Sequence, residues 1–246
     1  MKEVVETLSN VKFGKIQSFA KLTLVPLLAK DTNNENYEFL DDSLSTGKAI
    51  ISELDSSGSV PKIRLKNNGE TPILMIDGEE LVGCKQNRIL NLSILAAGNK
   101  EIEIPVSCVE RDRWSHESEN FRCSDNFEFA SLKSVKMESV SQSLRDNTEA
   151  FSDQGAVWSE IEKKTSSLGS SSDSRAMQGI YRANKEKVNQ YLKKLTIHKE
   201  QVGCIYVLNN KVKGLELFTS NKFFKRYAKK ILSGYLLDLL DNGTRI

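Results

Sequence analysis

The chain has 246 residues, of which 39% are hydrophobic and 28% charged, and its formal net charge is +2. These values are ordinary for a globular protein, and a chain of this size can bury a sizeable core. The small net charge argues against nucleic acid as the default partner, and no apolar run approaches the roughly 18–20 residues of a membrane span.

The N-terminal segment and the cysteines bear on the compartment. The first residues, MKEVVETLSNVKFGK, lack the apolar core of a secretory leader. The four cysteines are scattered without a C-x-x-C pair, so we expect reduced thiols in a cytoplasmic protein. With two histidines, a His/Cys zinc site is not expected, and any metal would be a hard cation such as Mg²⁺ held by carboxylates.

β-type apolar runs separated by turns dominate the first part of the chain. Residues 11–28 hold two such runs, and Pro26 indicates that the second lies at a sheet edge or ends there. A short helical turn, which residues 41–43 can cap, ends at Gly47 and precedes the strand AIISEL.

Three helices are predicted in the second half, at 131–145, 154–164 and 175–195. Ser152 or Asp153 is the expected N-cap of the second helix. The serine-rich segment 166–174 between the second and third helices has nothing to bury and is predicted to be a mobile loop.

The chain ends in a predicted hairpin and helix. GCIYVL and KVKGLELF flank Asn209-Asn210, a pair that tolerates the positive φ of a tight turn. Ser220 can cap the final helix, which carries one apolar stripe. The order of elements predicts an α+β fold in one domain, 1–246. An antiparallel sheet or sandwich would form the N-terminal half, and helices would pack on it from the C-terminal half.

The segment Thr71–Trp114 stands out because polar and ionisable residues interrupt its apolar runs. Polar groups inside apolar strands cost free energy unless they are paired or used in a site. A ligand site is therefore expected here. The residues concerned are Asp77, Glu79, Glu80, Lys85, Gln86, Asn87, Arg88, Glu110 and Arg113.

Two strands, at about 86–95 and 101–110, flank a short connector that contains Gly98, which suits an antiparallel hairpin. One register places only apolar pairs on one face, namely Ile94 with Ile102, Leu92 with Ile104 and Leu90 with Val106. The same face then carries Arg88 beside Cys108 and Gln86 beside Glu110. We therefore predict that an apolar ladder ends in a charged patch opening onto a cavity.

A tight turn at Asp77-Gly78 is expected to join ILMI to EELVG as a second hairpin. Glu79 and Glu80 point to opposite faces of a strand, so at most one of them joins the charged patch. Glu80 lies on the side of Gln86 only if Gly83 introduces no bulge, and the sequence leaves this open.

The functional interpretation assigns a role to each group in the patch. Glu110, with Glu79 or Glu80, would supply carboxylates for acid/base catalysis or for Mg²⁺. Anion binding would come from Arg88 and Lys85, and ligand orientation from Gln86 and Asn87. In the alternative interpretation, Arg88 and Glu110 form a buried pair that ties the hairpin to a neighbour, with nothing bound.

Two further residues have competing interpretations. Cys108 would need a base to act as a nucleophile, and His116 lies beyond the strand end, so a buried inert thiol is favoured. Trp114 could stack on a base or sugar, but a tryptophan that closes a core edge is favoured.

The runs DGEELVGCKQNRILNLSIL (77–95) and IPVSCVERDRW (104–114) resemble a family of bacterial and archaeal proteins, the ADP-ribosylglycohydrolase- and rhodanese-phosphatase-superfamily-associated protein domain. The likeness extends more weakly to residues 13–54 and 214–240. Cys84 stands where the pattern has a small residue such as alanine, and the serine-rich loop lies outside the pattern. The motif residues carried over are Asp77, Glu79, Glu80, Lys85, Gln86, Asn87, Arg88, Cys108, Glu110 and Trp114.

The resemblance implies a role near ADP-ribose, NAD-derived or other nucleotide-type ligands, in a prokaryotic stress or defence setting. Our first hypothesis is that the protein binds such an anionic ligand, with Arg88 as anion clamp. An extension of this hypothesis is that it also hydrolyses the ligand, with Glu110 as acid or base. The alternative is a non-catalytic interaction or scaffold module whose polar cluster is structural. A third reading, nucleic-acid binding through the basic final helix, conflicts with the small net charge. The sequence leaves metal dependence and homo-oligomer formation open.

Overall fold

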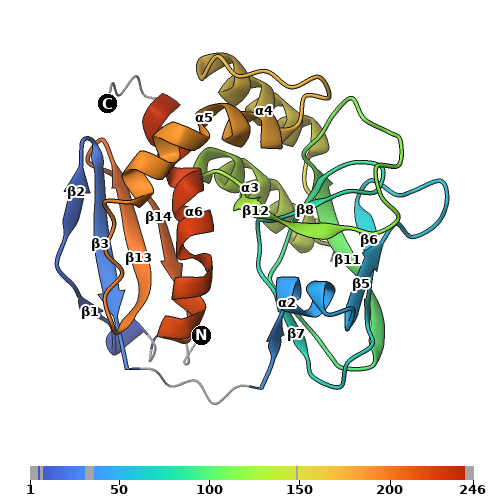
Figure 1. Cartoon of the computed structure of the whole chain (residues 1–246), viewed down its shortest axis with the longest axis horizontal. Coiled ribbons are helices and arrows are strands. Elements are labelled where there is room, and N and C mark those ends of the chain that lie inside the picture. The colour runs from blue at the N-terminus through green and yellow to red at the C-terminus, as the bar shows by residue number, and fades with distance from the viewer. Residues whose placement is uncertain (1–4, 6–7, 31–35, 148, 242–246) are drawn as a thin grey trace. The chain divides into compact units, whose positions relative to one another are not determined.

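A computed structural model describes residues 5, 8–30, 36–147 and 149–241. The chain forms two compact units, one built from the residues up to Lys30 together with those from Lys185 onward, the other from residues 36–184. Helices and sheets make up both units (Figure 1), and the strands pair antiparallel except for one parallel pair in the second unit, so the α+β prediction is confirmed. That the whole chain acts as a single domain stays a prediction.

The first unit joins strands from the two ends of the sequence into one antiparallel sheet (Figure 1). The order is β1-β3-β13-β14, and β2 also pairs with β3. The strands are β1 (Lys12–Phe13), β2 (Gln17–Phe19), β3 (Leu22–Leu28), β13 (Gln201–Leu208) and β14 (Lys211–Leu217).

Pro26 does not lie on an edge strand, because β3 has neighbours on both sides. It lies instead opposite a break in the sheet. Strand β1 pairs as far as Leu27 and β2 pairs only from Leu24, so neither reaches Pro26. The Pro26 carbonyl faces the side of β1 and β2, where it accepts a hydrogen bond from Gly14 N. Because the N and C=O of one residue in a strand point to the same side, the nitrogen of Pro26 faces that side too. The missing N–H therefore falls at the break.

The C-terminal hairpin and helix form as predicted. Asn209 and Asn210 have φ of 52° and 61°, as the tight turn requires. Helix α6 (Asn221–Asp241) lies along the sheet in Figure 1, and the predicted stripe is buried. The rings of Tyr206 on β13 and Tyr235 on α6 stack at 3.8 Å. Gly214 is needed below them, because a Cβ there would come within 1.9 Å of the Tyr235 hydroxyl.

The N-cap of α6 gives a first prediction. Ser220 Oγ accepts a hydrogen bond from Phe223 N at 3.1 Å. We expect Ser220→Ala to lower the free energy of unfolding by about 1 kcal/mol, because a backbone donor loses its acceptor. Urea denaturation measures the change. Ser233→Ala, in the middle of the same helix, is the control and should change stability little. Equal losses in both variants would contradict the cap.

The second unit contains two sheets, three helices and the first part of a fourth helix, which continues past Asn184 into the residues of the first unit. The larger sheet has the order β12-β8-β9-β11-β6-β5, and the smaller has the order β10-β7-β4. The strands are β4 (Glu38–Phe39), β5 (Ala49–Ser52), β6 (Lys62–Asn67), β7 (Ile73–Met75), β8 (Glu79–Val82), β9 (Arg88–Leu90), β10 (Ile94–Ala96), β11 (Lys100–Cys108) and β12 (Arg122–Phe127).

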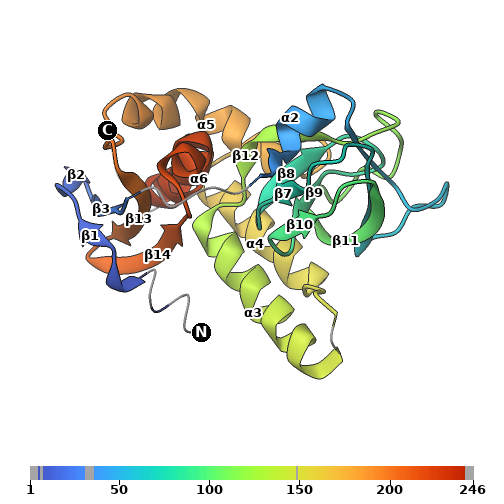
Figure 2. The ribbon, with the colours of Figure 1, turned by 90° about the horizontal axis from the view of Figure 1, so that it is seen from below.

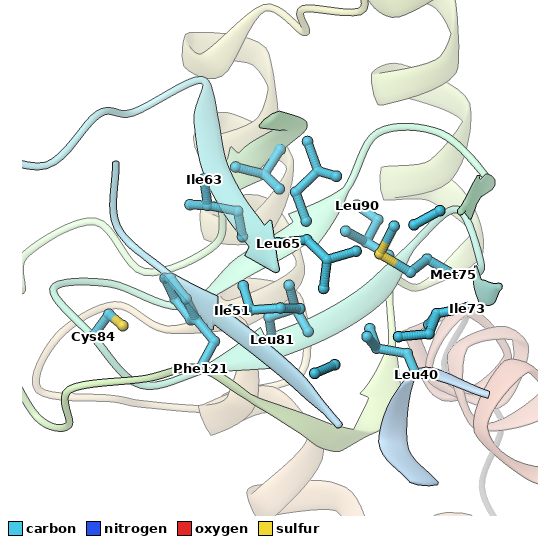
Figure 3. Close-up of a cluster of buried hydrophobic side chains, with 14 residues drawn as sticks. Leu40, Ile51, Ile63, Leu65, Ile73, Met75, Leu81, Cys84, Leu90 and Phe121 are labelled. Atoms are coloured by element: carbon cyan, nitrogen blue, oxygen red, sulfur yellow. The ribbon is translucent and has the colours of Figure 1, made fainter. Parts of the chain in front are cut away.

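The larger sheet curls around an apolar core. A backbone bond from Phe121 N to Ile51 O, 2.8 Å long, links the residue just before β12 to β5 at the opposite edge. Side chains from these strands meet inside this curve (Figure 3), with Ile51, Ile63 and Leu65 fully buried. Residues on the remaining strand faces must therefore meet the helices or solvent.

The predicted hairpin register is confirmed at one end and wrong at the other. Leu90 pairs with Val106 and Arg88 with Cys108, as predicted. Beyond Leu90 the two strands separate. The partners of Ile102 and Ile104 lie on β6, and Ile94 pairs with β7.

The physical reason for the separation is Asn91. Its side chain is drawn away from the ladder by bonds to Ala150 O and Ser107 Oγ, and the chain bends there. The Asp77-Gly78 turn also forms, with Glu79 N bonded to Ile76 O. Its flanking strands β7 and β8, however, belong to different sheets and form no hairpin.

The helices are α2 (Leu40–Ser45), α3 (Ala130–Asn147), α4 (Gln154–Ser167) and α5 (Met177–Leu192). Asp153 caps α4 through Ala156 N, as one of the two predicted caps. Residues 166–167, expected in the mobile loop, belong to α4, and the mobility of the rest stays a prediction. Helix α2 begins before the predicted caps, so Asp41 and Asp42 lie in its first turn. Figure 2 shows α3 and α4 side by side. No described helix combines the length and apolar composition that crossing a membrane requires.

Candidate functional site

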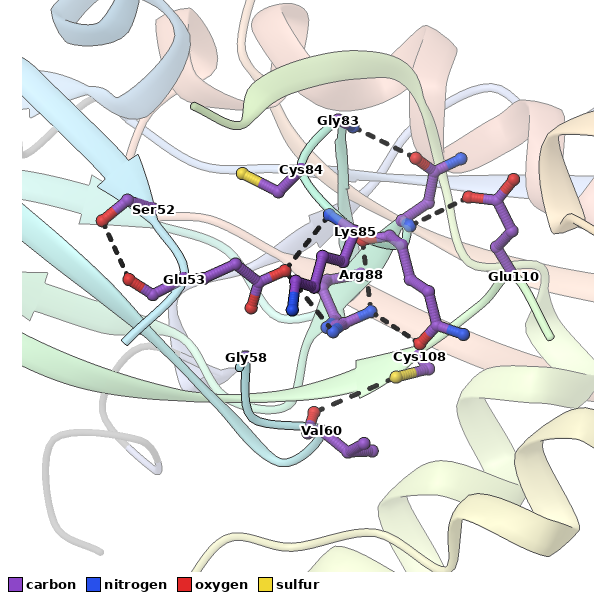
Figure 4. A network of polar contacts seen from close by, with 12 residues as sticks. Ser52, Glu53, Gly58, Val60, Gly83, Cys84, Lys85, Arg88, Cys108 and Glu110 are labelled. Atoms are coloured by element: carbon purple, nitrogen blue, oxygen red, sulfur yellow. Dashed lines mark hydrogen bonds and ion pairs between the residues drawn. The ribbon is translucent and has the colours of Figure 1, made fainter. Parts of the chain in front are cut away.

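The polar motif residues hold the loop between β8 and β9, residues 83–87, mainly through its backbone (Figure 4). Tight loops leave backbone N–H groups without ladder partners. Here four of them find side-chain acceptors, namely Gly83 N with Asn87 Oδ1, Cys84 N with Ser118 Oγ, Lys85 N with Glu53 Oε1 and Asn87 N with Glu110 Oε2. The cluster is thus used largely to satisfy a loop.

Arg113 holds the same loop through its carbonyl groups. Its guanidinium donates to Cys84 O at 2.6 Å and to Gly83 O at 3.3 Å. It also forms an ion pair with Glu110 at 2.6 Å. Donors and acceptors of the loop are therefore both bound by buried or half-buried charged side chains.

Arg88 and Glu110 do not pair with each other, contrary to the alternative interpretation. Arg88 is fully buried and its ion-pair partner is Glu53, at 3.8 Å. It also donates to the backbone and side-chain oxygens of Gln86, both at 3.1 Å. Glu110 lies past the end of β11 and reaches Arg113 instead. Gln86, Arg88 and Glu110 are only 4%, 0% and 5% exposed, so they lie sealed in the protein.

Glu79 and Glu80 are both fully buried. Glu80 accepts hydrogen bonds from Ser124 Oγ at 2.5 Å and Asn126 Nδ2 at 3.1 Å. Burial raises the pKa of Glu80 to about 7, the Ser124 and Asn126 donors oppose the rise, and the negative charge of Glu110 adds to it. The charge of Glu110 thus affects the pKa of Glu80, although Glu80 forms no hydrogen bond to the 83–87 loop.

Asp77 belongs to a separate buried cluster. Lys136 on α3, fully buried, donates to Asp77 Oδ1 at 2.5 Å and to Leu90 O at 2.7 Å, and lies 3.0 Å from Glu128 Oε1. Gly78 has φ of +82°, and a Cβ there would come within 2.5 Å of Glu128. Only glycine fits this turn against the carboxylate.

Trp114 is 46% exposed, and its ring centroid lies 5.8 Å from the guanidinium carbon of the fully buried Arg88. Lys85 Nζ lies 5.3 Å from its ring centroid, and donates to Ser56 O and Ser57 O at 2.6 and 2.7 Å. Lys85 therefore fastens one surface loop and is not free to clamp an anion.

Cys108 is held on its backbone rather than through its thiol. Gln154 bonds to both Cys108 N and Cys108 O, each at 2.8 Å, and so imitates a neighbouring strand. Burial raises the pKa of the Cys108 thiol to about 11. His116, the base that it would need, is exposed. A thiol in this state is protonated at neutral pH and unsuited to nucleophilic attack.

The candidate carboxylates do not fit a Mg²⁺ site. Hydroxyl, amide, backbone and guanidinium donors already bind the oxygens of Glu110 and one oxygen of Glu80. Among the described residues, no three His, Cys, Asp or Glu side chains are grouped so that they could hold a metal ion. We therefore derive no step through a metal.

A cavity of about 170 Å³ lies beside the Glu110 segment, in the same unit. Its lining includes Arg111, Trp158 and Arg175, with Ile161, Glu162, Thr165 and Ser166 from the end of α4. The Arg111 guanidinium stacks over the Trp158 ring at 5.4 Å. Two guanidinium groups and an indole thus line one hollow.

The sequence reading missed the residues of this cavity. Arg111 directly follows the motif glutamate, Trp158 lies inside the predicted helix 154–164, and Arg175 is the first residue of the predicted helix 175–195. Arg113, Glu53 and Lys136 also carry more of the buried network than expected. A signal for Lys136 exists in the sequence, because it lies four residues from both Leu132 and Val140 on the buried face of α3.

Comparison with known proteins gives one match. A family model described as the ARG and Rhodanese-Phosphatase-superfamily-associated Protein domain matches residues 10–245. Neither a search of curated proteins nor a search of solved structures found a match. The motif runs 77–95 and 104–114 lie within the matched range. Because the match spans nearly the whole sequence, the chain belongs to the ARG and rhodanese-phosphatase-superfamily-associated protein domain family.

Proposed function

We propose that the protein binds a small anionic ligand of the nucleotide type, such as ADP-ribose or an NAD-derived compound, at the cavity beside Arg111. The observation that carries the proposal is the meeting of Arg111, Arg175 and Trp158 around one hollow. Guanidinium groups match the planar geometry of phosphate and carboxylate oxygens. The association recorded in the family's name supports the choice of ADP-ribose, within the prokaryotic stress or defence role that the resemblance implies.

Both arginines can turn to a ligand at little cost. Arg111 pairs with Glu162 at 3.6 Å, and Arg175 forms a two-point pair with Asp112. The Arg175 guanidinium holds the pKa of Asp112 below its usual value. All four side chains are more than one third exposed. Exposed pairs contribute about 0–1 kcal/mol, with two-point pairs such as Arg175–Asp112 the stronger ones, so a ligand anion can replace the carboxylates at that cost.

Trp158 adds a hydrogen-bond donor, its indole Nε1–H. Its Nε1 is buried and has no hydrogen-bond partner among the described residues. A buried polar group without a partner costs free energy, and an oxygen of a bound ligand would remove that cost. Arg111 is at the same time oriented by its stacking on the indole.

The size of the cavity limits what it encloses. At about 170 Å³ it is smaller than the roughly 300–1,000 Å³ of sites that surround a whole drug-sized molecule. The proposed site therefore encloses one phosphate and its attached sugar, and the rest of the ligand remains outside. Inorganic phosphate and AMP are accordingly the minimal probes.

The proposal concerns binding, and hydrolysis is a separate outcome to measure. The predicted catalytic residues Glu79, Glu80 and Glu110 are 0%, 0% and 5% exposed. The carboxylate at the cavity is that of Glu162, which lies near Arg111. Chromatography of ADP-ribose after incubation with the protein tests for hydrolysis, and Glu162→Gln tests whether that carboxylate takes part.

The cavity arginines give the second prediction. We expect Arg175→Gln and Arg111→Gln each to weaken binding of ADP-ribose and AMP roughly 10- to 100-fold, the loss of a charge-assisted hydrogen bond. Isothermal titration calorimetry measures the dissociation constants. Arg182→Gln, an exposed arginine on α5 that does not line the cavity, is the matched control and should bind as the wild type does.

Two results would overturn the proposal. One is the absence of heat with ADP-ribose, AMP and inorganic phosphate at millimolar concentration. The other is equal weakening in the Arg182→Gln control, which would indicate a diffuse charge effect instead of a site. Adenosine, which has no phosphate, should bind far more weakly than AMP.

A scaffold module is the second candidate, and a specific observation favours it. The polar cluster around residues 83–87 binds mainly the backbone of the loop, through contacts within the protein. Since Arg88 and Glu110 both hold structure, Arg88→Gln and Glu110→Gln should destabilise the fold under either proposal. The cavity variants decide between the two, because only ligand binding makes Arg111 and Arg175 matter.

A further inference from the structure

We infer that Ser174 is a positioning residue, whose hydroxyl bond to the buried carboxylate of Glu110 fixes the neighbouring Arg175 at the cavity. The inference rests on the proposed function for its ligand-binding consequence. It also has a structural consequence that can be measured without any ligand. It gives the buried motif glutamate a role in binding although Glu110 itself does not line the cavity.

The two carboxylate oxygens of Glu110 bind different segments of the chain. Its Oε2 accepts from Asn87 N at 3.1 Å and from Arg113 at 2.6 Å. Its Oε1 accepts from Ser174 Oγ at 2.5 Å. One oxygen therefore holds the 83–87 loop, and the other holds the segment that carries Arg175.

Backbone hydrogen bonds join the segment around Ser174 to the segment around Glu110. Asp112 N donates to Ser174 O at 3.0 Å, and Met177 N donates to Val109 O at 2.8 Å. A β-bridge joins Glu110 to Ala176. Residues 174–177 are thus laid against residues 109–112, so Arg111 and Arg175 are carried by two chain segments that are bonded together.

Arg175 itself has an unusual backbone conformation. Its φ is +49°, in the left-handed region that residues with a Cβ rarely adopt. Such a conformation persists only where the surrounding contacts impose it. Arg175 N donates to Ser172 O at 3.0 Å and its guanidinium pairs with Asp112, while the Ser174–Glu110 bond and the β-bridge of Ala176 hold the residues on either side. Loss of the hydroxyl would release Arg175 to more extended conformations.

Hydrogen exchange tests the positioning without a ligand. In the full chain, Ser174→Ala should speed exchange of the Asp112 and Met177 amides, whose hydrogen bonds join residues 109–112 to residues 174–177. Ser174→Thr keeps the hydroxyl and should restore slow exchange. Ser171→Ala, exposed in the same segment, is the control and should leave both amides slow. Unchanged exchange in Ser174→Ala would overturn the inference, whatever the binding result.

Calorimetry with AMP then tests the consequence for binding. Ser174→Ala should weaken AMP binding roughly 3- to 10-fold, because the released Arg175 side chain must then be ordered when AMP binds, and Ser174→Thr should bind as the wild type does. Equal AMP binding by Ser174→Ala and the wild type would overturn the link between Ser174 and the site. Faster exchange with no AMP binding by the wild type would uphold the positioning role and remove the proposed function.

Discussion

Replacing Lys136 by methionine should lower the free energy of unfolding by about 3–5 kcal/mol, as breaking a buried ion pair does. The Lys136 ammonium is fully buried and its three N–H donors face Asp77, Glu128 and Leu90 O. Methionine has a similar length and fills the same space, so the loss is electrostatic. Burial raises the pKa of Glu128 to about 7, and Lys136 opposes the rise. Without the lysine, Glu128 must take up a proton or remain charged in the core.

A double-mutant cycle separates the pair from the packing. Glu128→Gln removes one buried charge, and the double variant Lys136→Met with Glu128→Gln should be less destabilised than the sum of the two single variants. Urea denaturation measures all four proteins. Lys163→Met on α4, where the lysine side chain is 76% exposed, is the control and should stay within about 0.5 kcal/mol of the wild type. A loss below 1 kcal/mol in Lys136→Met would contradict the buried triad.

The sequence could show that the motif residues have partners inside the protein or in a ligand, but it could not show which groups those partners are. Glu110 and Asn87 are bonded to backbone groups of the loop, and such partners leave no mark in a residue pattern. The register of Arg88 with Cys108 could be predicted because it follows from alternation of apolar residues. The departure of the chain after Leu90 could not, because it depends on a contact between Asn91 and the distant Ala150.

The cavity lay beyond sequence reasoning for a related reason. Arg111, Trp158 and Arg175 come from three segments that local periodicity does not relate. In the sequence, Arg111 follows the predicted strand 101–110, Trp158 lies inside one predicted helix and Arg175 begins another, so none of them stands out alone. Lys136 is different, because a lysine in the middle of an apolar helical face predicts a buried charge. That pattern also holds for Lys164, which lies on the face of Val157 and Ile161 and is 3% exposed.

Glu80→Gln should raise stability at alkaline pH and change it little at acid pH. Burial raises the pKa of Glu80 from its ordinary 4.5 to about 7 in the folded state. A carboxyl whose folded pKa is raised binds its proton more tightly when folded, so its contribution is complete below about pH 4.5 and is lost as the pH rises through about 7. Well above pH 7 the ionised group costs about 3 kcal/mol, because its pKa in the fold lies well above its ordinary value. Glutamine resembles the protonated acid and escapes this cost.

The measurement is the difference in unfolding free energy between Glu80→Gln and the wild type, from urea denaturation at a series of pH values from 5 to 9. Taking the difference removes the titration of the other groups. It should rise with pH most steeply between about pH 4.5 and 7, where the carboxyl is ionised in the unfolded chain but still protonated in the fold, and level off above pH 7. Glu138→Gln, exposed on α3, should give a flat difference. If Glu80→Gln is flat as well, Glu80 is already ionised in the core at neutral pH. The donors Ser124 and Asn126 would then stabilise the charge more than burial opposes it.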